Sequence, residues 1–408
     1  MSNSACIWYI SKYLVPPGRG TVGTRGYRIM RELASRGDQI VLITSNSNHL
    51  AVPRTLRTRF EMERVDGMQL WWLRTMRYSA AKSLRRALSW IHFEWRLACM
   101  PLAQLPMPDV IVVSSLSLLT VLNGLRLRRR FGCRLVFEVR DIWPLTLTAE
   151  GGFSAKNPLV WMLGAIERLG YRHADAIIGT MPNLGEHVQE VLREARTVHC
   201  VPMGVPDESL EPSATLPKVI ERISLPSEKC IVAHVGSIGI SNALETLLRC
   251  AQQLSEDTRL HFLLVGAGDL AESYAQRFAS LRNLTVVPRV DSAAVPVILE
   301  RCDIAYFATH PSRVWAFGQS LNKVIDYMLA GKPVVGSYSG FPSMIDEAKC
   351  GEFVPAGDPI ALAESLQRLA SLGPDHRVAM GARGREWLLK HRRYKDLATA
   401  YRRILIGP

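Results

Sequence analysis

Residues 317–335, FGQSLNKVIDYMLAGKPVV, carry the side chains whose types and spacing point most directly to ligand chemistry. A helix is expected to begin near Leu321, because the sequence AGKP at 330–333 supplies the glycine and proline that commonly end helices. Lys323 then lies in the first turn, where a cation opposes the helix dipole and a bound phosphate would compensate for it. Asp326, one turn further, can accept hydrogen bonds from ribose hydroxyls. We expect Asn322, Lys323 and Asp326 to bind a nucleotide.

A second group of reactive side chains follows the strand-like sequence RLVFEVR. Glu138, Arg140 and Asp141 lie at or just beyond its end, followed by a tryptophan and a proline. Ligands of open α/β sheets bind beyond the carboxyl ends of strands, so this position favours a catalytic role for the three residues. The alternative for Asp141 is that it caps the next helix.

A glycine-rich loop, YLVPPGRGTVGTRG, follows the first strand-like run. Gly18, Gly20 and Gly23 precede a helix that should start near Thr24. Glycines allow a close approach of the backbone to a ligand, and a helix N-terminus offers free N–H groups to an anion. The spacing fits neither the dinucleotide fingerprint nor a P-loop, so a flexible strand–helix turn is an equal alternative.

Similar loops occur in the second half of the chain. HVGSIG places Gly236 and Ser237 in a tight turn before a helix expected near Asn242, where backbone N–H groups can contact phosphate. LTVVPRV places Arg289 just past a strand, where it can pair with a phosphate or remain a surface arginine.

Strand and helix patterns alternate along almost the whole chain, and these elements must position the loops. Short apolar runs between helical segments indicate parallel sheets buried on both faces. A proline-rich stretch, residues 202–226, separates two such series. We therefore predict an α/β protein of two doubly wound Rossmann-like domains facing across a cleft. The first domain covers residues 1–204 and the second 205–385, and a C-terminal helix, 386–408, packs back on the first domain.

Positive charge is concentrated in one region. The 408 residues carry a net charge of +13, and residues 51–100 hold ten Lys or Arg against four acids. Within them, AAKSLRRALSWIHFEWRLACM (80–100) reads as a helix with Leu84, Leu88, Ile91, Trp95 and Ala98 on one face. Lys82, Arg85 and Arg86 beside Trp90 and Trp95 give the composition of a helix that lies on an anionic membrane. An ordinary amphipathic helix packed on its own sheet is the equal alternative.

Composition also excludes several classes of protein. The eight cysteines form no CxxC pair, which indicates reduced thiols in a cytosolic protein rather than a zinc or disulfide framework. The longest apolar-rich uncharged run, 110–125, is shorter than the about 20 residues of a membrane span. The N-terminus lacks the pattern of a signal peptide. No nucleic-acid-binding motif appears, so a nucleic-acid partner is not expected.

Taken together and in order, these motifs resemble glycosyltransferase family 4, the retaining nucleotide-sugar enzymes of the GT-B fold. The likeness runs over nearly the whole chain, and EVRDIWP and the GTR after the glycine loop are similar to the subgroup that builds bacterial surface polysaccharide. It departs where many members carry two glutamates eight positions apart, because this chain has Gly318 and Asp326. A basic pair common after the HVGSIG-type loop is replaced by Ser241 and Asn242, and a histidine by Arg140.

The resemblance implies a transferase that moves a sugar, by expectation an N-acetylated amino sugar, from a UDP-sugar to a lipid-linked glycan with retention. It implies lipopolysaccharide, O-antigen or capsule synthesis by a cytoplasmic protein associated peripherally with the inner membrane. No cofactor or metal is expected, and the sequence contains no Asp-x-Asp. Glu138 and Asp141 would orient the acceptor or stabilise the cationic sugar. A nucleotide-sugar 2-epimerase of the same fold, or a catalytically silent relative, remains an alternative.

Overall fold

A computed structural model describes residues 4–18, 23–48, 53–78, 84–115, 117–210 and 223–407. It divides into two compact units, one formed by Met1–Gly204 with Tyr394–Pro408 and the other by Val205–Arg393. Each unit is an α/β domain built on a largely or wholly parallel sheet. The predicted two Rossmann-like domains are therefore present, and the return to the first unit begins at Tyr394 rather than at residue 386.

Unit 1 contains an eight-stranded sheet in the order β3-β4-β2-β1-β5-β6-β7-β8. Its strands are β1 (Cys6–Ile10), β2 (Gln39–Ser45), β3 (Phe60–Val65), β4 (Met68–Leu73), β5 (Val110–Ser114), β6 (Arg134–Val139), β7 (Ala176–Gly179) and β8 (Val198–Cys200). Every neighbouring pair is parallel except β3 with β4, which form an antiparallel edge that the sequence patterns did not predict. Strands β1 and β5 are buried at every residue, which explains their uninterrupted apolar sequences.

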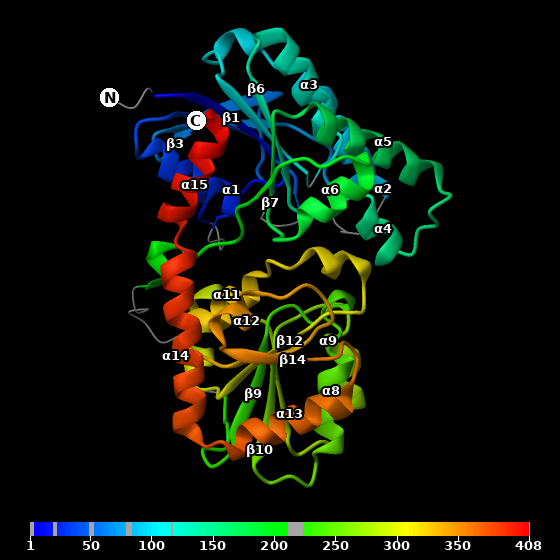
Figure 1. Cartoon of the computed structure of the whole chain (residues 1–408), viewed down its shortest axis with the longest axis vertical. Helices are drawn as coiled ribbons and strands as arrows, with labels where there is room; N and C mark the ends of the chain where they lie inside the picture. Colours follow the sequence, from blue (N-terminus) through cyan, green and yellow to red (C-terminus); the bar gives the residue numbers. More distant parts are fainter. Residues whose placement is uncertain are drawn as a thin grey trace. The chain divides into compact units, whose positions relative to one another are not determined.

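Helices cover both faces of this sheet. The helices are α1 (Arg25–Ala34), α2 (Leu84–Ala98), α3 (Thr120–Phe131), α4 (Leu145–Ala149), α5 (Pro158–His173), α6 (Leu184–Leu192) and α15 (Tyr394–Ile406), with a 3-10 turn η1 (Leu102–Gln104). Helices α1 and α15 pack on each other and share one core with the strands, whereas α2, α3, α5 and α6 form a second layer (Figure 1). Tyr401 and Leu405 of α15 are fully buried in that core, so the C-terminal segment is an integral part of unit 1.

Unit 2 contains a six-stranded parallel sheet in the order β11-β10-β9-β12-β13-β14. Its strands are β9 (Cys230–Val235), β10 (Leu260–Val265), β11 (Leu284–Val287), β12 (Ile304–Ala308), β13 (Val334–Ser337) and β14 (Gly351–Val354). Its helices and turns are η2 (Asp207–Leu210), η3 (Ile240–Asn242), α8 (Glu245–Gln253), α9 (Ala271–Arg277), η4 (Ser292–Ala294), α10 (Val295–Glu300), η5 (Arg313–Phe317), α11 (Asn322–Leu329), α12 (Met344–Ala348), α13 (Pro359–Ser371) and α14 (Pro374–His391). The helix expected near Asn242 begins instead at Glu245, because a 3-10 turn comes first.

Candidate functional site

The carboxyl edge of the unit 2 sheet is shaped by two closely packed glycine loops. Gly236 N donates to the Val265 carbonyl at 2.9 Å, and a Cβ placed on Gly266 would lie only 1.8 Å from the Gly236 carbonyl oxygen. Gly268 is similarly constrained, since its Cβ would meet the Ile238 carbonyl oxygen at 2.5 Å. Gly266 and Gly268 therefore serve to bring the loops together. Gly236 and the exposed Ser237 remain at the surface of this edge.

Lys323 is the cation beside this loop. It lies in the first turn of α11, as predicted, and its Cε is 3.9 Å from the position of a Cβ built on Gly236. Its ammonium donates a hydrogen bond to the side-chain oxygen of Asn242, and desolvation lowers its pKa to about 8. The amide does not neutralise the charge, so Lys323 presents a cation at the edge where an anion would meet the loop.

His234 lies beneath Lys323 and carries no charge at neutral pH. Burial, and secondarily the charge of Lys323, lower its pKa to about 3. Its ring nitrogens are within hydrogen-bonding range of two carbonyl oxygens, at 3.2 Å for Tyr306 and 3.4 Å for Ser237. Neither His234 nor the contact of Asn242 with Lys323 was predicted from the sequence. The available signal for His234 was a histidine inside the apolar strand CIVAHV.

The other predicted nucleotide-binding residues are less tightly grouped. Asn322 and Asp326 are exposed on α11. Neighbouring protein atoms partly desolvate the Asp326 carboxylate, which raises its pKa to about 6. Arg289 is exposed after β11 and has no hydrogen-bond partner in the described part of the chain. Because β10 lies between β11 and β9, Arg289 is roughly 10 Å from the β9 loop along the sheet.

Glu138 lies in the interior of unit 1, which argues against its predicted catalytic contact with a ligand. Its side chain is fully buried and pairs with Arg25 Nη1 at 2.6 Å. Tyr9 and Tyr401 donate hydroxyl hydrogen bonds to it at 2.6 and 2.8 Å. Burial alone would raise the pKa of Glu138, but the charges of Arg25 and Arg140 outweigh it and hold the pKa below its usual value.

This network has a structural function. Arg25 also donates to the carbonyls of Val201, at 2.6 Å, and Pro202, at 3.1 Å. Together the contacts join α1, β6, α15 and the segment after β8. The position of Arg25 directly after the glycine loop could have drawn attention to it. Tyr401 is 263 residues from Glu138, so no local sequence pattern could predict that hydrogen bond.

Arg140 and Asp141 are better placed to meet a ligand. The Arg140 backbone N–H is not available to a ligand, because it donates a hydrogen bond to Ser115 Oγ at 3.0 Å. The side-chain Nε of Arg140 is buried and has no hydrogen-bond partner among the described residues. The Asp141 side chain is exposed and does not cap α4, whose N-cap is Pro144. A guanidinium and a carboxylate therefore stand at the carboxyl end of β6.

The N-terminal glycine loop is only partly described. Gly18 and Gly23 have φ of +108° and +78°, which favours glycine at both positions. Thr24 N donates to the Val15 carbonyl at 2.9 Å, which closes the loop before α1. Gly20 lies outside the described residues, and the predicted anion contact of Gly18 stays a prediction.

Helix α2 turns three large residues of its predicted apolar face outward. Leu88, Ile91 and Trp95 are 44%, 60% and 54% exposed, whereas Phe93 on the opposite side is fully buried. The helix does pack on its own unit, as the alternative proposed, but through Phe93 and Leu97 rather than through Leu88, Ile91 and Trp95. Arg85 is exposed with the apolar face, and Lys82 lies outside the described residues.

Two residues predicted for the outer surface belong to the inner side of α2. Trp90 Nε1 and Arg86 Nε donate to the Tyr13 hydroxyl at 2.6 and 3.2 Å, and Trp90 packs edge-on against Trp143 at 5.3 Å. Their polar ends are held by unit 1, so neither presents its side chain freely to a membrane. Glu94 also points inward and accepts hydrogen bonds at 2.6 to 3.2 Å from Ser117, Thr120 and Asn123.

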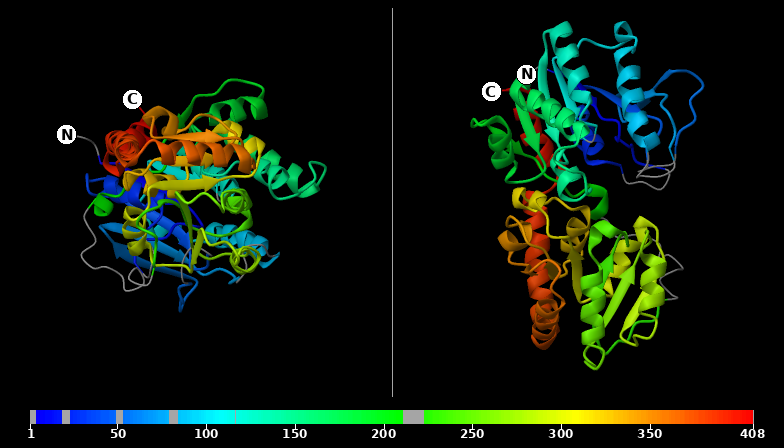
Figure 2. Two further views of the ribbon diagram at one scale, coloured as in Figure 1. Left: turned by 90° about the horizontal axis from the view of Figure 1, so that it is seen from below. Right: turned by 90° about the vertical axis from the view of Figure 1, so that its right-hand side faces the viewer.

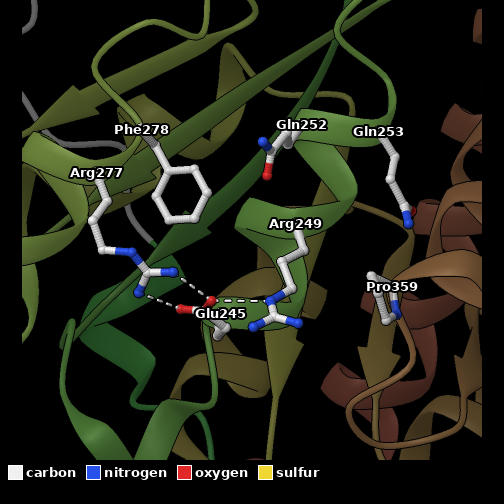
Figure 3. A pocket seen from close by; sticks show the side chains of 7 residues that line it. All are labelled: Glu245, Arg249, Gln252, Gln253, Arg277, Phe278 and Pro359. Atoms are coloured by element: carbon white, nitrogen blue, oxygen red, sulfur yellow. Dashed lines mark hydrogen bonds and ion pairs between the residues drawn. The ribbon is translucent and has the colours of Figure 1, made fainter.

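A hollow on the helical surface of unit 2 is a poor candidate for a catalytic site. It is lined by residues of α8, by Arg277 and Phe278 near the end of α9, and by Pro359. Figure 3 shows Glu245 between Arg249 and Arg277, and the carboxylate bonds them at 3.0 and 2.8 Å. Both arginines are thus ion-paired with the same carboxylate, and the residues described above do not line this hollow.

No group of three or more His, Cys, Asp or Glu that could hold a metal ion occurs within the residues that the structure describes. Over the same residues, no helix combines the length and apolar character needed to cross a bilayer.

Comparisons with known families identify both halves of the chain. Residues 20–204 match the family model "Glycosyl transferase 4-like domain", and residues 229–371 match "Glycosyl transferases group 1". The chain is 22% identical over 269 residues to a probable glycosyltransferase, WbjE, of Pseudomonas aeruginosa. That alignment covers 65% of this chain and 66% of WbjE, so the chain spans just under two thirds of that relative.

Solved structures show the same fold. The E. coli trehalose-6-phosphate protein bound with UDP-2-fluoro glucose superposes with a TM-score of 0.74 at 13% identity, covering 99% of both chains. WaaG, a glycosyltransferase involved in lipopolysaccharide biosynthesis, gives a TM-score of 0.65 at 14% identity over 98% of this chain and 100% of its own.

Proposed function

Because the chain is a glycosyltransferase with the GT-B fold, we propose that it transfers a sugar from a UDP-sugar to a lipid-linked glycan at an anionic membrane surface. The sugar proposed is an N-acetylated amino sugar, and the product a bacterial surface glycolipid such as lipopolysaccharide, O-antigen or capsule. WaaG, named for lipopolysaccharide biosynthesis, supports that class of product. The resemblance in sequence supports retention of anomeric configuration.

The observation that carries the donor assignment is Lys323 beside the Gly236–Ser237 loop. A cation and a glycine turn at the carboxyl edge of a parallel sheet suit a diphosphate. Asp326, on the same helix, suits the ribose hydroxyls, and Arg289 adds charge at the same edge. The bound UDP-2-fluoro glucose of a structural neighbour supports UDP as the carrier.

The proposed chemistry follows from these groups. The acceptor hydroxyl oxygen forms a bond to the anomeric carbon while the bond from that carbon to the diphosphate oxygen breaks. The hydroxyl proton passes to the departing phosphate. Lys323 and Arg289 stabilise the charge that develops on the leaving group. Arg140 and Asp141 are proposed to orient the acceptor and to stabilise the cationic sugar.

The acceptor assignment rests on α2. Trp90, Arg86 and Glu94 make their contacts with unit 1, whereas Leu88, Ile91 and Trp95 are left in solvent. Exposing these three apolar side chains to water is unfavourable unless an apolar partner covers them. A membrane interface provides such a partner, and the exposed Arg85 and the basic composition favour an anionic one. An enzyme acting on a lipid-linked glycan meets its acceptor at that surface.

The donor proposal is tested by UDP release from a panel of UDP-sugars, with and without a lipid-linked acceptor. Release that requires the acceptor is expected, and Lys323→Ala should reduce it. Arg249→Ala in the ion-paired surface hollow is the matched control and should leave it unchanged. Interconversion of the UDP-sugar without release of UDP would instead indicate an epimerase. A protein that binds no UDP-sugar would be a catalytically silent relative.

The membrane proposal is tested by vesicle sedimentation with Leu88→Ser/Ile91→Ser and, separately, Arg85→Glu. Both should bind phosphatidylglycerol vesicles less than the natural protein. Val378→Ser in α14 removes a side chain that is 67% exposed in unit 2 and serves as the control. Unchanged binding of the α2 variants would contradict the assignment.

A further inference from the structure

A second group of exposed apolar side chains lies in unit 1, between α4 and the first turns of α5. Phe153, Leu159, Trp161 and Met162 are 40%, 41%, 68% and 48% exposed. Four large apolar residues are therefore exposed within ten positions of the chain, a density that single scattered surface residues do not reach. We call Phe153, Leu159, Trp161 and Met162 the α4–α5 tip.

The local structure presents these side chains rather than leaving them loose. The Asn157 side chain accepts a hydrogen bond from Leu159 N at 2.9 Å and caps α5, and Pro158 occupies its first turn. Val160 and Leu163 of the same helix are buried and anchor it to unit 1. Helix α4 contains no buried residue, and the segment that joins it to α5 projects from unit 1 (Figure 2).

The charge around the tip suits an electrically neutral surface better than a strongly charged one. Residues 151–166 contain one cation, the exposed Lys156, and no acid. The flanking acid Glu150 is exposed, whereas Glu167 is buried and bonded to His187 at 2.7 Å and to Tyr171 at 3.0 Å. The charges of Lys156 and Glu150 balance, so the tip offers mainly apolar contact.

The size of the patch decides between two kinds of apolar partner. Fully exposed side chains of this size present on the order of 200 Å² each, so four half-exposed ones offer roughly 400 Å². A stable protein interface needs about 800 Å² on each partner, which makes a second copy of this chain a poor occupant. A bilayer requires no matching surface, tryptophan is favoured at the headgroup level, and phenylalanine and leucine are typical of the apolar face of interfacial segments.

We propose that the α4–α5 tip inserts into the headgroup region of the bilayer as a second membrane contact, additional to α2. The inference rests on the proposed membrane association. The two elements are joined structurally, because Trp143, two residues before α4, packs edge-on against Trp90 of α2 at 5.3 Å. The tip supplies mainly apolar contact, whereas α2 also supplies exposed charge through Arg85.

The test compares Phe153→Ser/Trp161→Ser with Ile360→Ser, whose side chain is 61% exposed in unit 2. Sedimentation with phosphatidylcholine vesicles containing phosphatidylglycerol is measured at low and high salt. The tip variant should partition at least about tenfold more weakly, because burial of a single aromatic side chain is worth more than a factor of ten. The deficit should persist at high salt, where electrostatic attraction is screened. The control should bind like the natural protein.

Further readouts separate this proposal from the proposed function. Thermal unfolding and UDP release with a water-soluble acceptor should be unchanged in the tip variant. Full vesicle binding by the tip variant would overturn the inference. If the α2 variants lose vesicle binding in the same assay, the proposed membrane association through α2 would still hold. A natural protein that binds no vesicles overturns both. A dimer in sedimentation velocity that dissociates in the tip variant, with vesicle binding unchanged, would assign the tip to self-association instead.

Discussion

Glu138→Gln should destabilise unit 1 strongly while leaving the chemistry of the folded protein intact. The carboxylate is fully buried and accepts hydrogen bonds from Arg25 at 2.6 Å, Tyr9 at 2.6 Å and Tyr401 at 2.8 Å. A carboxamide has only one oxygen. Its NH₂ group would replace the other carboxylate oxygen and would face groups that now donate hydrogen bonds to that oxygen. The guanidinium of Arg25 would remain buried without its counter-charge.

The expected cost is about 3–5 kcal/mol, the usual consequence of removing one partner of a buried ion pair. For a domain of roughly 200 residues, each kcal/mol lowers the melting temperature by about 2–4 °C, so a decrease of about 6–20 °C is expected. Differential scanning calorimetry of the full chain measures it. Tyr401→Phe keeps the ion pair and loses one hydrogen bond to a charged group, so its cost should be smaller, about 1.5–3 kcal/mol.

Turnover measured well below the melting temperature separates the two roles of Glu138. The folded Glu138→Gln protein should release UDP at close to the natural rate, because the side chain reaches no solvent. A variant that melts like the natural protein but has lost turnover would refute the structural assignment.

Three further predictions concern the ligand. Titration calorimetry should show UDP affinity falling as the pH rises above about 8, because the lowered pKa of Lys323 means that its positive charge is lost there, whereas Lys323→Arg should remain flat; a parallel decline in both would implicate another group. Asp326→Ala should weaken UDP but leave inorganic diphosphate nearly unaffected, and equal losses would contradict contact with the ribose. Asp141→Asn should lower kcat far more than UDP affinity, and a natural rate of sugar transfer would remove Asp141 from the catalytic groups.

The order of elements could be predicted because burial on both faces makes most strands continuous apolar runs. The strand β3, FEMERV, could not, since an edge strand with alternating polar residues has no such run. Lys323 and Gly236 were placed at one edge because the carboxyl ends of parallel strands meet there. The burial and partners of Glu138 could not be predicted, because strand position shows where a side chain starts but not which distant residues pair with it, here Tyr401.

Helix α2 shows a second limit of sequence patterns. The spacing of Leu88, Ile91 and Trp95 indicates that they share a face, and that proved correct. Whether the face points inward depends on polar partners elsewhere, such as Tyr13, which binds Trp90, and Asn123, which binds Glu94. No periodicity within the helix contains that information.

The packing of α15 on unit 1 has a consequence for synthesis of the chain. Five buried residues of α15 complete a core whose other buried members lie before residue 204: Tyr394, Leu397, Ala398, Tyr401 and Leu405. At about 5–20 residues per second, a ribosome needs roughly 10–40 s to add the residues of unit 2 that come between. During that interval the nascent first domain exposes the apolar groove that α15 will fill. Chaperone binding to ribosome-held chains should therefore persist after residue 204 has emerged from the ribosome. It should end only when α15 has also emerged and packed on the first domain.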